Sequence, residues 1–206
     1  MIKNIIFDFG GVIITLSHIE GVRRFKALGV EDADKQLDPY TQGGIFGQLE
    51  KGEIDAEQFR LLLSQMVHRE VSADECFHAW LGYREDVPQR NLDILRQLRK
   101  EGYRLILLSN TNPYMMRWAA NPGFDGHGHA VQDYFDATYL SYQLGVMKPD
   151  IRFFDHVIAH ENIIPQETLF VDDGPRNVAA AAKLGLKTFC PENGSDWTQA
   201  IRDHLG

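Results

Sequence analysis

The pattern of apolar and polar positions along the chain predicts short buried strands separated by amphipathic helices. Four runs rich in β-branched and aliphatic residues are interpreted as strands, and a fifth run is weaker. The strong runs are Ile2–Phe7, Tyr103–Leu108, Thr168–Val171 and Leu186–Phe189, and the weak run is Ala137–Leu140. Apolar residues at nearly every position of such a run are typical of parallel strands covered on both faces.

Amphipathic segments lie between these runs. One begins at Pro88, carries leucines on a single face and ends at Gly102. Another begins at Gly174-Pro175, continues as the alanine-rich stretch VAAAAKL and ends at Gly185. Strands that alternate with helices in this way predict an α/β fold, a doubly wound Rossmann-like parallel sheet.

The stretch between the first two strong strands departs from this alternation. The segments DAEQFRLLLSQM and SADECFHAWLGY both carry apolar residues at helical spacing, and Asp55 and Gln58 are placed as a capping box. This is more helix than a crossover between two strands needs. We therefore predict that residues 16–87 form an inserted α-helical cap, and that residues 1–15 and 88–206 form the core. Phe46, Leu49 and Glu50 are the residues of this insert that we consider as facing a site.

Composition narrows the class of protein. The chain has 206 residues, of which 44% are apolar and 24% are charged, and this is enough to bury one core with a smaller appendage. The net charge is −8, and the lysines and arginines are scattered, which argues against a nucleic-acid partner. The two cysteines, Cys76 and Cys190, fit no metal or redox spacing, so we expect reduced thiols.

The N-terminal region carries no pattern of export. Asp8 interrupts the first apolar run too early for a signal peptide. No run approaches the roughly 18 apolar residues of a membrane helix. We therefore expect a soluble cytoplasmic protein without a membrane partner, either a monomer or a dimer.

Residues capable of chemistry follow the predicted strands. In chain order they are Asp8, the cluster Ser109-Asn110-Thr111-Asn112, Lys148, and the pair Asp172-Asp173. Ligands of parallel α/β sheets bind at the carboxyl ends of the strands, so these residues would share one edge. Carboxylates can hold Mg²⁺, a lysine and hydroxyl groups can hold phosphate oxygens, and an aspartate can attack phosphorus. The set predicts metal-assisted phosphoryl transfer.

Four segments of the chain resemble the motifs of the haloacid dehalogenase superfamily of hydrolases. They are FDFGGV, LSNTN, GVMKPD and FVDDGPRNVAAAAKLG, and they occur in the order that the superfamily uses. The resemblance covers the whole core, and the position of the insert is similar to the helical-cap branch. LSNTN and the phrase FGQLEKGEIDAEQF are most similar to bacterial sugar-phosphate phosphatases, notably α-D-glucose-1-phosphate phosphatase. The phosphatase domain of soluble epoxide hydrolase is a more distant relative.

The resemblance implies a role for each motif residue. Asp8 would be the nucleophile and a ligand of Mg²⁺, and Lys148 would act in catalysis by orienting Asp8 and neutralising phosphate charge. The other implied metal ligands are the carbonyl of Gly10 and the carboxylates of Asp172 and Asp173, with Asp172 in direct contact or just behind. The implied phosphate-binding residues are Ser109, Asn110 and Lys148. Asn177 stands where relatives often have aspartate, so its metal role would be indirect.

Gly10 is a departure from most phosphatases of the superfamily, which carry a second aspartate at this position. That residue protonates the leaving alcohol and then activates water, and a positioned acid–base group is worth roughly 10²–10⁴ in rate. Because the rest of the apparatus is present, we predict an active phosphatase of a small phosphorylated metabolite. An anomeric sugar phosphate would suit Gly10, since its leaving group depends less on protonation.

Two other functions stay open. A 2-haloacid dehalogenase also lacks the second aspartate, but its chemistry needs no metal, and Asp172-Asp173 argue for a metal site. A catalytically silent protein that binds a phosphorylated metabolite is favoured by Gly10 alone. The Gly- and His-rich loop 121–133 has no function that the sequence assigns, and we regard a metal site at His127 and His129 as the weaker interpretation of that loop.

Overall fold

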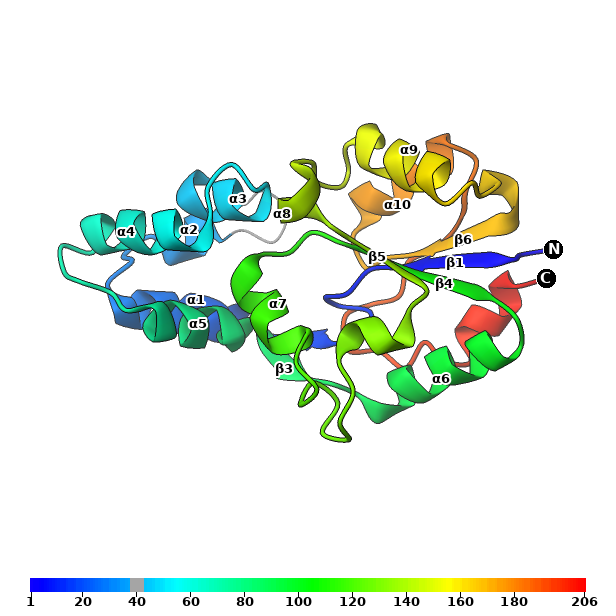
Figure 1. The fold of residues 1–206 in the computed structure, drawn as a ribbon, viewed down its shortest axis with the longest axis horizontal. Coiled ribbons are helices and arrows are strands. Elements are labelled where there is room, and N and C mark those ends of the chain that lie inside the picture. Colours follow the sequence, from blue (N-terminus) through cyan, green and yellow to red (C-terminus); the bar gives the residue numbers. More distant parts are fainter. Residues whose placement is uncertain (38–42) are drawn as a thin grey trace.

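A parallel sheet of five strands forms the centre of the molecule, in the order β5-β4-β1-β6-β7 (Figure 1). The computed structural model describes residues 1–37 and 43–206. The strands are β1 (Asn4–Phe7), β4 (Arg104–Ser109), β5 (Ala137–Leu140), β6 (Thr168–Val171) and β7 (Lys187–Phe189). All five predicted strands are confirmed, and their bounds shift by at most two residues. β4 extends to Ser109 because this residue pairs with Leu140 of β5.

Helices cover both faces of the sheet, as the predicted doubly wound fold requires. On one face lie α9 (Ile151–His160) and α10 (Pro175–Lys183), and on the other lies α6 (Gln89–Lys100) (Figure 1). Alternate residues of β1 serve the two faces. Ile5 and Phe7 pack in the cluster that contains the leucines of α6, whereas Ile6 packs in the cluster that contains α9 and α10.

Short elements complete the core. They are α7 (Pro113–Ala119), α8 (Ser141–Leu144), and the 3-10 turns η2 (Val131–Tyr134), η3 (Pro165–Glu167) and η4 (Ala200–His204). α7 begins directly after the LSNTN segment, where the Asn112 side chain accepts hydrogen bonds from the Tyr114 and Met115 amides. This N-cap of α7 fixes the loop that follows β4.

The long segment between β1 and α6 forms helices beside the sheet rather than on its faces (Figure 1). They are α1 (His18–Leu28), α2 (Ala33–Gln36), α3 (Gly44–Glu50), α4 (Ala56–Met66) and α5 (Ala73–Trp80), followed by the 3-10 turn η1 (Leu81–Tyr83). The predicted capping box is present, because Asp55 and Gln58 exchange side-chain and backbone hydrogen bonds of 2.8 and 2.9 Å. The division of the chain into domains at 15/16 and 87/88 stays a prediction.

Aromatic side chains hold these helices together. The rings of Phe25, Phe46, Phe59 and Trp80 are buried and meet edge to face or tilted, with centroids 5.0–6.5 Å apart. The chain enters and leaves this helical region through a small antiparallel pair, β2 (Thr15–Leu16) and β3 (Arg84–Asp86). The two ends of the helical region therefore lie side by side, close to the end of β1.

Within the described ranges, none of the helices combines the length and the apolar character needed to cross a bilayer. The expected cytoplasmic location stays a prediction.

Candidate active site

A pocket of about 460 Å³ opens at the carboxyl ends of the strands, between the sheet and the helices α1–α5. It is lined by the residues that the sequence singled out at this edge, together with residues of the helical region. From the core come Asp8, Gly10, Ser109, Asn110, Lys148, Asp173 and Asn177. The predicted convergence of the four motifs at one edge is therefore what the structure shows.

Asp8 and Lys148 form an ion pair at the bottom of the pocket. The Lys148 Nζ lies 2.8 Å from Asp8 Oδ1 and 2.6 Å from Asp172 Oδ2, and it donates a third bond of 2.8 Å to the Leu108 carbonyl. Burial lowers the pKa of Lys148, but the carboxylates of Asp172 and Asp8 outweigh this effect and raise it above its usual value. The ammonium therefore remains charged and uses its three donors to hold both carboxylates in place.

Asp8 is held in one orientation. Its Oδ1 also accepts a bond of 2.7 Å from the Phe9 amide. Among the described residues nothing donates a hydrogen bond to Oδ2. Burial raises the pKa of Asp8, and Lys148 opposes this shift. The arrangement presents one carboxylate oxygen toward the pocket while the other is fixed.

Asp172 is completely buried, and donors surround it. Its Oδ1 accepts bonds from the Gly174 amide and from Asn177 Nδ2, and its Oδ2 accepts from Lys148 and again from Asn177. Asn177 thus contacts Asp172 directly, and an indirect metal role for Asn177 stays a prediction. The Asp172 carboxylate is therefore fixed against the Lys148 ammonium.

Asp173 differs from its neighbour, because its carboxylate is only partly buried and lines the pocket. Burial and the adjacent Asp172 raise the pKa of Asp173 to about 6. A Cβ placed on Gly11, whose φ is +79°, would lie 2.1 Å from Asp173 Oδ2. The carboxylate is therefore seated directly against the Gly11 backbone, and only glycine leaves room for it.

The carboxylates of Asp8, Asp172 and Asp173 offer oxygen atoms that lie within 4.8 Å of one another. Hard oxygen donors at this spacing fit Mg²⁺, and like charges at this distance repel unless a cation joins them. The donor chemistry of the site therefore suits a divalent metal ion.

The hydroxyl–amide cluster after β4 joins the site from the other side. Ser109 and Asn110 line the pocket. The Asn110 side chain is engaged with the Lys148 backbone, donating 2.9 Å to its carbonyl and accepting 2.8 Å from its amide. This pair of bonds fixes the loop that carries Lys148.

Gly10 faces the side chain of Leu16. A Cβ built on Gly10 would lie 2.7 Å from Leu16 Cδ1. The Leu16 backbone is itself clamped by Asn193, whose side chain accepts from the Leu16 amide and donates to its carbonyl, each at 2.9 Å. An aliphatic side chain thus occupies the space beside Gly10.

The helical region contributes pocket residues that sequence reasoning mostly missed. They are Leu16, His18, Leu37, Glu50, Trp80 and Tyr83. Of the three residues considered in the insert, Glu50 lines the pocket, while Phe46 and Leu49 do not and are buried in the cap core. Trp80 is buried and also borders the pocket. His18 follows β2 and Tyr83 precedes β3 in the sequence. Both residues therefore lie near the points where the insert leaves and rejoins the core, and this position could have indicated that they line the pocket.

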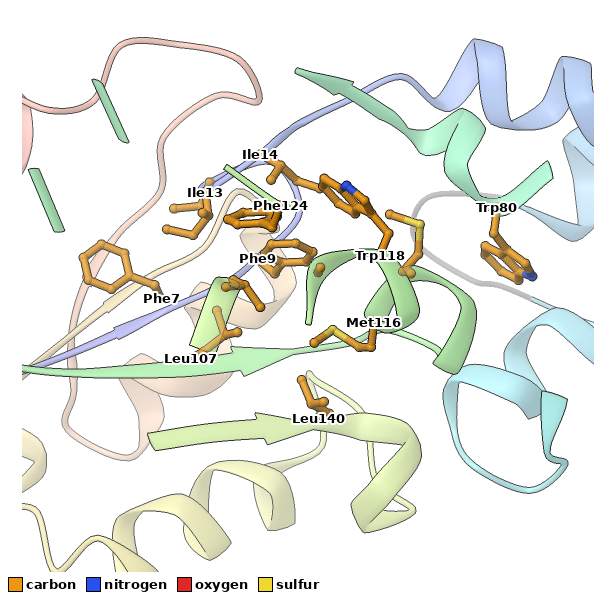
Figure 2. Close-up of a cluster of buried hydrophobic side chains, with 14 of the residues drawn as sticks. Phe7, Phe9, Ile13, Ile14, Trp80, Leu107, Met116, Trp118, Phe124 and Leu140 are labelled. Atoms are coloured by element: carbon orange, nitrogen blue, oxygen red, sulfur yellow. The ribbon is translucent and has the colours of Figure 1, made fainter. Parts of the chain in front are cut away.

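The loop 121–133 lies outside the pocket, and its contacts are structural. Phe124 packs against Phe9, the residue that follows Asp8, and against Trp118, with ring centroids 6.0 and 5.2 Å apart (Figure 2). His129 Nδ1 is 2.8 Å from Asp125 Oδ2. Across residues 1–37 and 43–206, the only group of three potential metal ligands is the one at Asp8, so the metal interpretation of His127 and His129 gains no support.

Comparison with known proteins identifies the family. The haloacid dehalogenase-like hydrolase family matches residues 2–185. The chain is 49% identical over 201 residues to D-ribitol-5-phosphate phosphatase of Bacteroides thetaiotaomicron, covering 98% of this chain and 97% of the relative.

Solved structures agree with this. A HAD-like family hydrolase from Porphyromonas gingivalis superimposes with a TM-score of 0.95 at 44% identity, covering 100% of this chain and 98% of the other. A HAD family enzyme of B. thetaiotaomicron, solved with magnesium and inorganic phosphate, gives 0.88 at 36% identity, covering 98% and 100%. The chain therefore belongs to the haloacid dehalogenase-like hydrolases.

Proposed function

We propose that this protein is a Mg²⁺-dependent phosphatase that hydrolyses the phosphate ester of a small sugar or sugar alcohol. The observation that carries the proposal is the arrangement of Asp8, Lys148, Asp172 and Asp173 at one edge of the sheet. Support comes from the relative that acts on D-ribitol 5-phosphate and from the related enzyme solved with magnesium and phosphate.

Asp8 is the proposed nucleophile. Its Oδ1 is held by Lys148 and the Phe9 amide, so Oδ2 is the oxygen aimed at phosphorus. Attack forms an aspartyl-phosphate and releases the alcohol, and water then hydrolyses the intermediate. Asp8, Asp173 and the Gly10 carbonyl would hold the metal, which when bound supplies positive charge beside the phosphoryl oxygens.

The other residues take supporting roles. We propose that Asp172 acts through Lys148 rather than as a ligand, because the hydrogen-bond partners of its carboxylate among the described residues are all nitrogen donors. The positive charge of Lys148, which contacts Asp8, partly neutralises the negative charge of the bound phosphate. The Ser109 hydroxyl and the backbone amide of Asn110 are the expected donors to phosphate, because the Asn110 side chain is already bonded to Lys148. Such fixed donors stabilise the charge that develops during transfer.

A sugar-alcohol phosphate replaces an anomeric sugar phosphate as the first substrate to test. The relative that shares 49% identity acts on a pentitol phosphate. The pocket of about 460 Å³ is large enough for such a molecule, and the polar residues Glu50, Asn112 and Tyr83 are among those that line it.

The test is phosphate release from D-ribitol 5-phosphate, glucose 1-phosphate, glucose 6-phosphate and p-nitrophenyl phosphate, with Mg²⁺ and with EDTA. We expect Mg²⁺-dependent release that falls by at least about 10³-fold in Asp8→Asn. Binding of inorganic phosphate without turnover of any ester would identify the silent binder. Halide release from 2-haloacids in EDTA would identify the dehalogenase.

A further inference from the structure

The proposed reaction needs a group that donates a proton to the leaving alcohol, and position 10 does not supply one. The alcohol of a sugar-alcohol phosphate is a poor leaving group, and its oxygen needs a proton as the bond to phosphorus breaks. Gly10 has no side chain to supply it, and Leu16 fills the space where an acid at position 10 would begin. The double clamp from Asn193 holds the Leu16 backbone in place. The proton donor must therefore come from another wall of the pocket.

Most titratable groups that line the pocket are already committed. Lys148 donates its three hydrogen bonds to Asp8, Asp172 and the Leu108 carbonyl. Asp8 is the nucleophile, and Asp173 belongs to the carboxylate group that suits a metal ion. Burial and the nearby Glu50 raise the pKa of Tyr83 far above its usual value, so this phenol is a weak acid. Glu50 and Arg176 have partners of their own.

His18 lines the pocket and is anchored through one ring nitrogen, which leaves the other nitrogen for proton transfer. It is the first residue of α1, it borders the pocket, and its Nε2 lies 2.7 Å from the Leu37 carbonyl. A carbonyl only accepts hydrogen bonds, so Nε2 carries a proton in either charge state. The exchangeable proton is therefore the one on Nδ1. The Tyr83 ring contacts the imidazole edge to face, with ring centroids 6.2 Å apart and an interplanar angle of 62°.

We propose that His18 is the general acid and base of the reaction. It would take the role of the second aspartate, which is absent here because position 10 is a glycine. This proposal rests on the proposed phosphatase function. In the first step Asp8 Oδ2 bonds to phosphorus, the ester P–O bond breaks, and the leaving oxygen takes the Nδ1 proton of the imidazolium. In the second step neutral Nδ1 takes a proton from water, whose oxygen bonds to phosphorus. The bond to Asp8 breaks, releasing inorganic phosphate and restoring the imidazolium.

The test separates proton transfer from binding by varying the leaving group. The variant His18→Gln can keep the bond to the Leu37 carbonyl through its amide, and His78→Gln, on the exposed part of α5, is the matched control. We expect kcat/KM of His18→Gln for D-ribitol 5-phosphate to fall about 10²–10⁴-fold. For p-nitrophenyl phosphate, whose leaving group needs no proton, kcat/KM should change less than about threefold.

The second step gives an independent readout. Without a base, the aspartyl-phosphate should accumulate, so His18→Gln should release a burst of p-nitrophenol equal to the enzyme before a slow steady rate. Equal losses of kcat/KM on both substrates, or no loss on either, would overturn the role of His18. Absence of phosphate release by the wild-type protein from every ester would instead overturn the proposed function.

Discussion

At the scale of single residues, Gly11 sets the position of a proposed metal ligand. A Cβ at this position would come within 2.1 Å of Asp173 Oδ2. We expect Gly11→Ala to displace the carboxylate and weaken Mg²⁺ binding by about 10- to 100-fold, as measured by calorimetric titration.

A matched control separates this displacement from backbone strain. Gly102 also has a positive φ, +94°, but a Cβ there would meet nothing within 4 Å. Gly102→Ala should share the strain of about 1–2 kcal/mol and leave Mg²⁺ affinity unchanged. Equal affinities in Gly11→Ala and the wild type would show that Asp173 does not bind the metal.

At the scale of elements, the N-cap of α4 tests how the helical region folds. Asp55 accepts a hydrogen bond of 2.8 Å from the Gln58 amide. Asp55→Ala should lower the free energy of unfolding by about 1 kcal/mol, and Asp55→Asn should lose little, because asparagine caps equally well. Urea unfolding followed by circular dichroism measures both.

The same experiment tests the predicted domain division. If residues 16–87 form a domain of their own, Asp55→Ala should produce an early partial transition, with a later transition unchanged from the wild type. A single transition that shifts as a whole would show that the helices and the sheet unfold together.

The elements of the fold were predictable because their signals are local. Thr168–Val171 and Ala137–Leu140 are strands with the predicted bounds, since apolar runs between turn residues decide them. Gly102 and Gly185 end their helices with positive φ angles, as glycine allows. The order of the motifs then placed Asp8, Lys148 and Asp172 at one edge without any knowledge of contacts.

The cap side of the pocket could not be predicted in this way. His18 and Tyr83 meet because β2 pairs with β3 across more than sixty intervening residues. Phe46 and Leu49 lie on the same helix as Glu50, yet only Glu50 reaches the pocket, because aromatic packing with Phe25 and Trp80 turns Phe46 inward. Helical spacing defines a face but not which partner that face meets.

At the scale of the whole molecule, a metal ion held by Asp8 and Asp173 would make the stability of the fold depend on Mg²⁺. A ligand that binds only the folded state stabilises it, by about 2.7 kcal/mol at one hundred times its Kd. For a chain of this size we expect saturating Mg²⁺ to raise the Tm by about 5–10 °C. Scanning calorimetry with Mg²⁺ and with EDTA measures the shift.

The variant Asp173→Asn provides the contrast. It removes one of the carboxylates that lie within 4.8 Å of one another, so the metal-free protein should be at least as stable as the wild type. The stabilisation by Mg²⁺ should largely disappear. A full Tm shift in this variant would place the metal elsewhere.

The contact between Gly10 and Leu16 also bears on how such a site changes during evolution. An aspartate at position 10 can enter only if the Leu16 side chain turns aside, because Leu16 Cδ1 lies 2.7 Å from where the new Cβ would stand. The effects of substitutions at these two positions should therefore be non-additive. A lineage that passes between the glycine and the aspartate form has an easier route when position 16 becomes smaller first, so the order of the two changes matters.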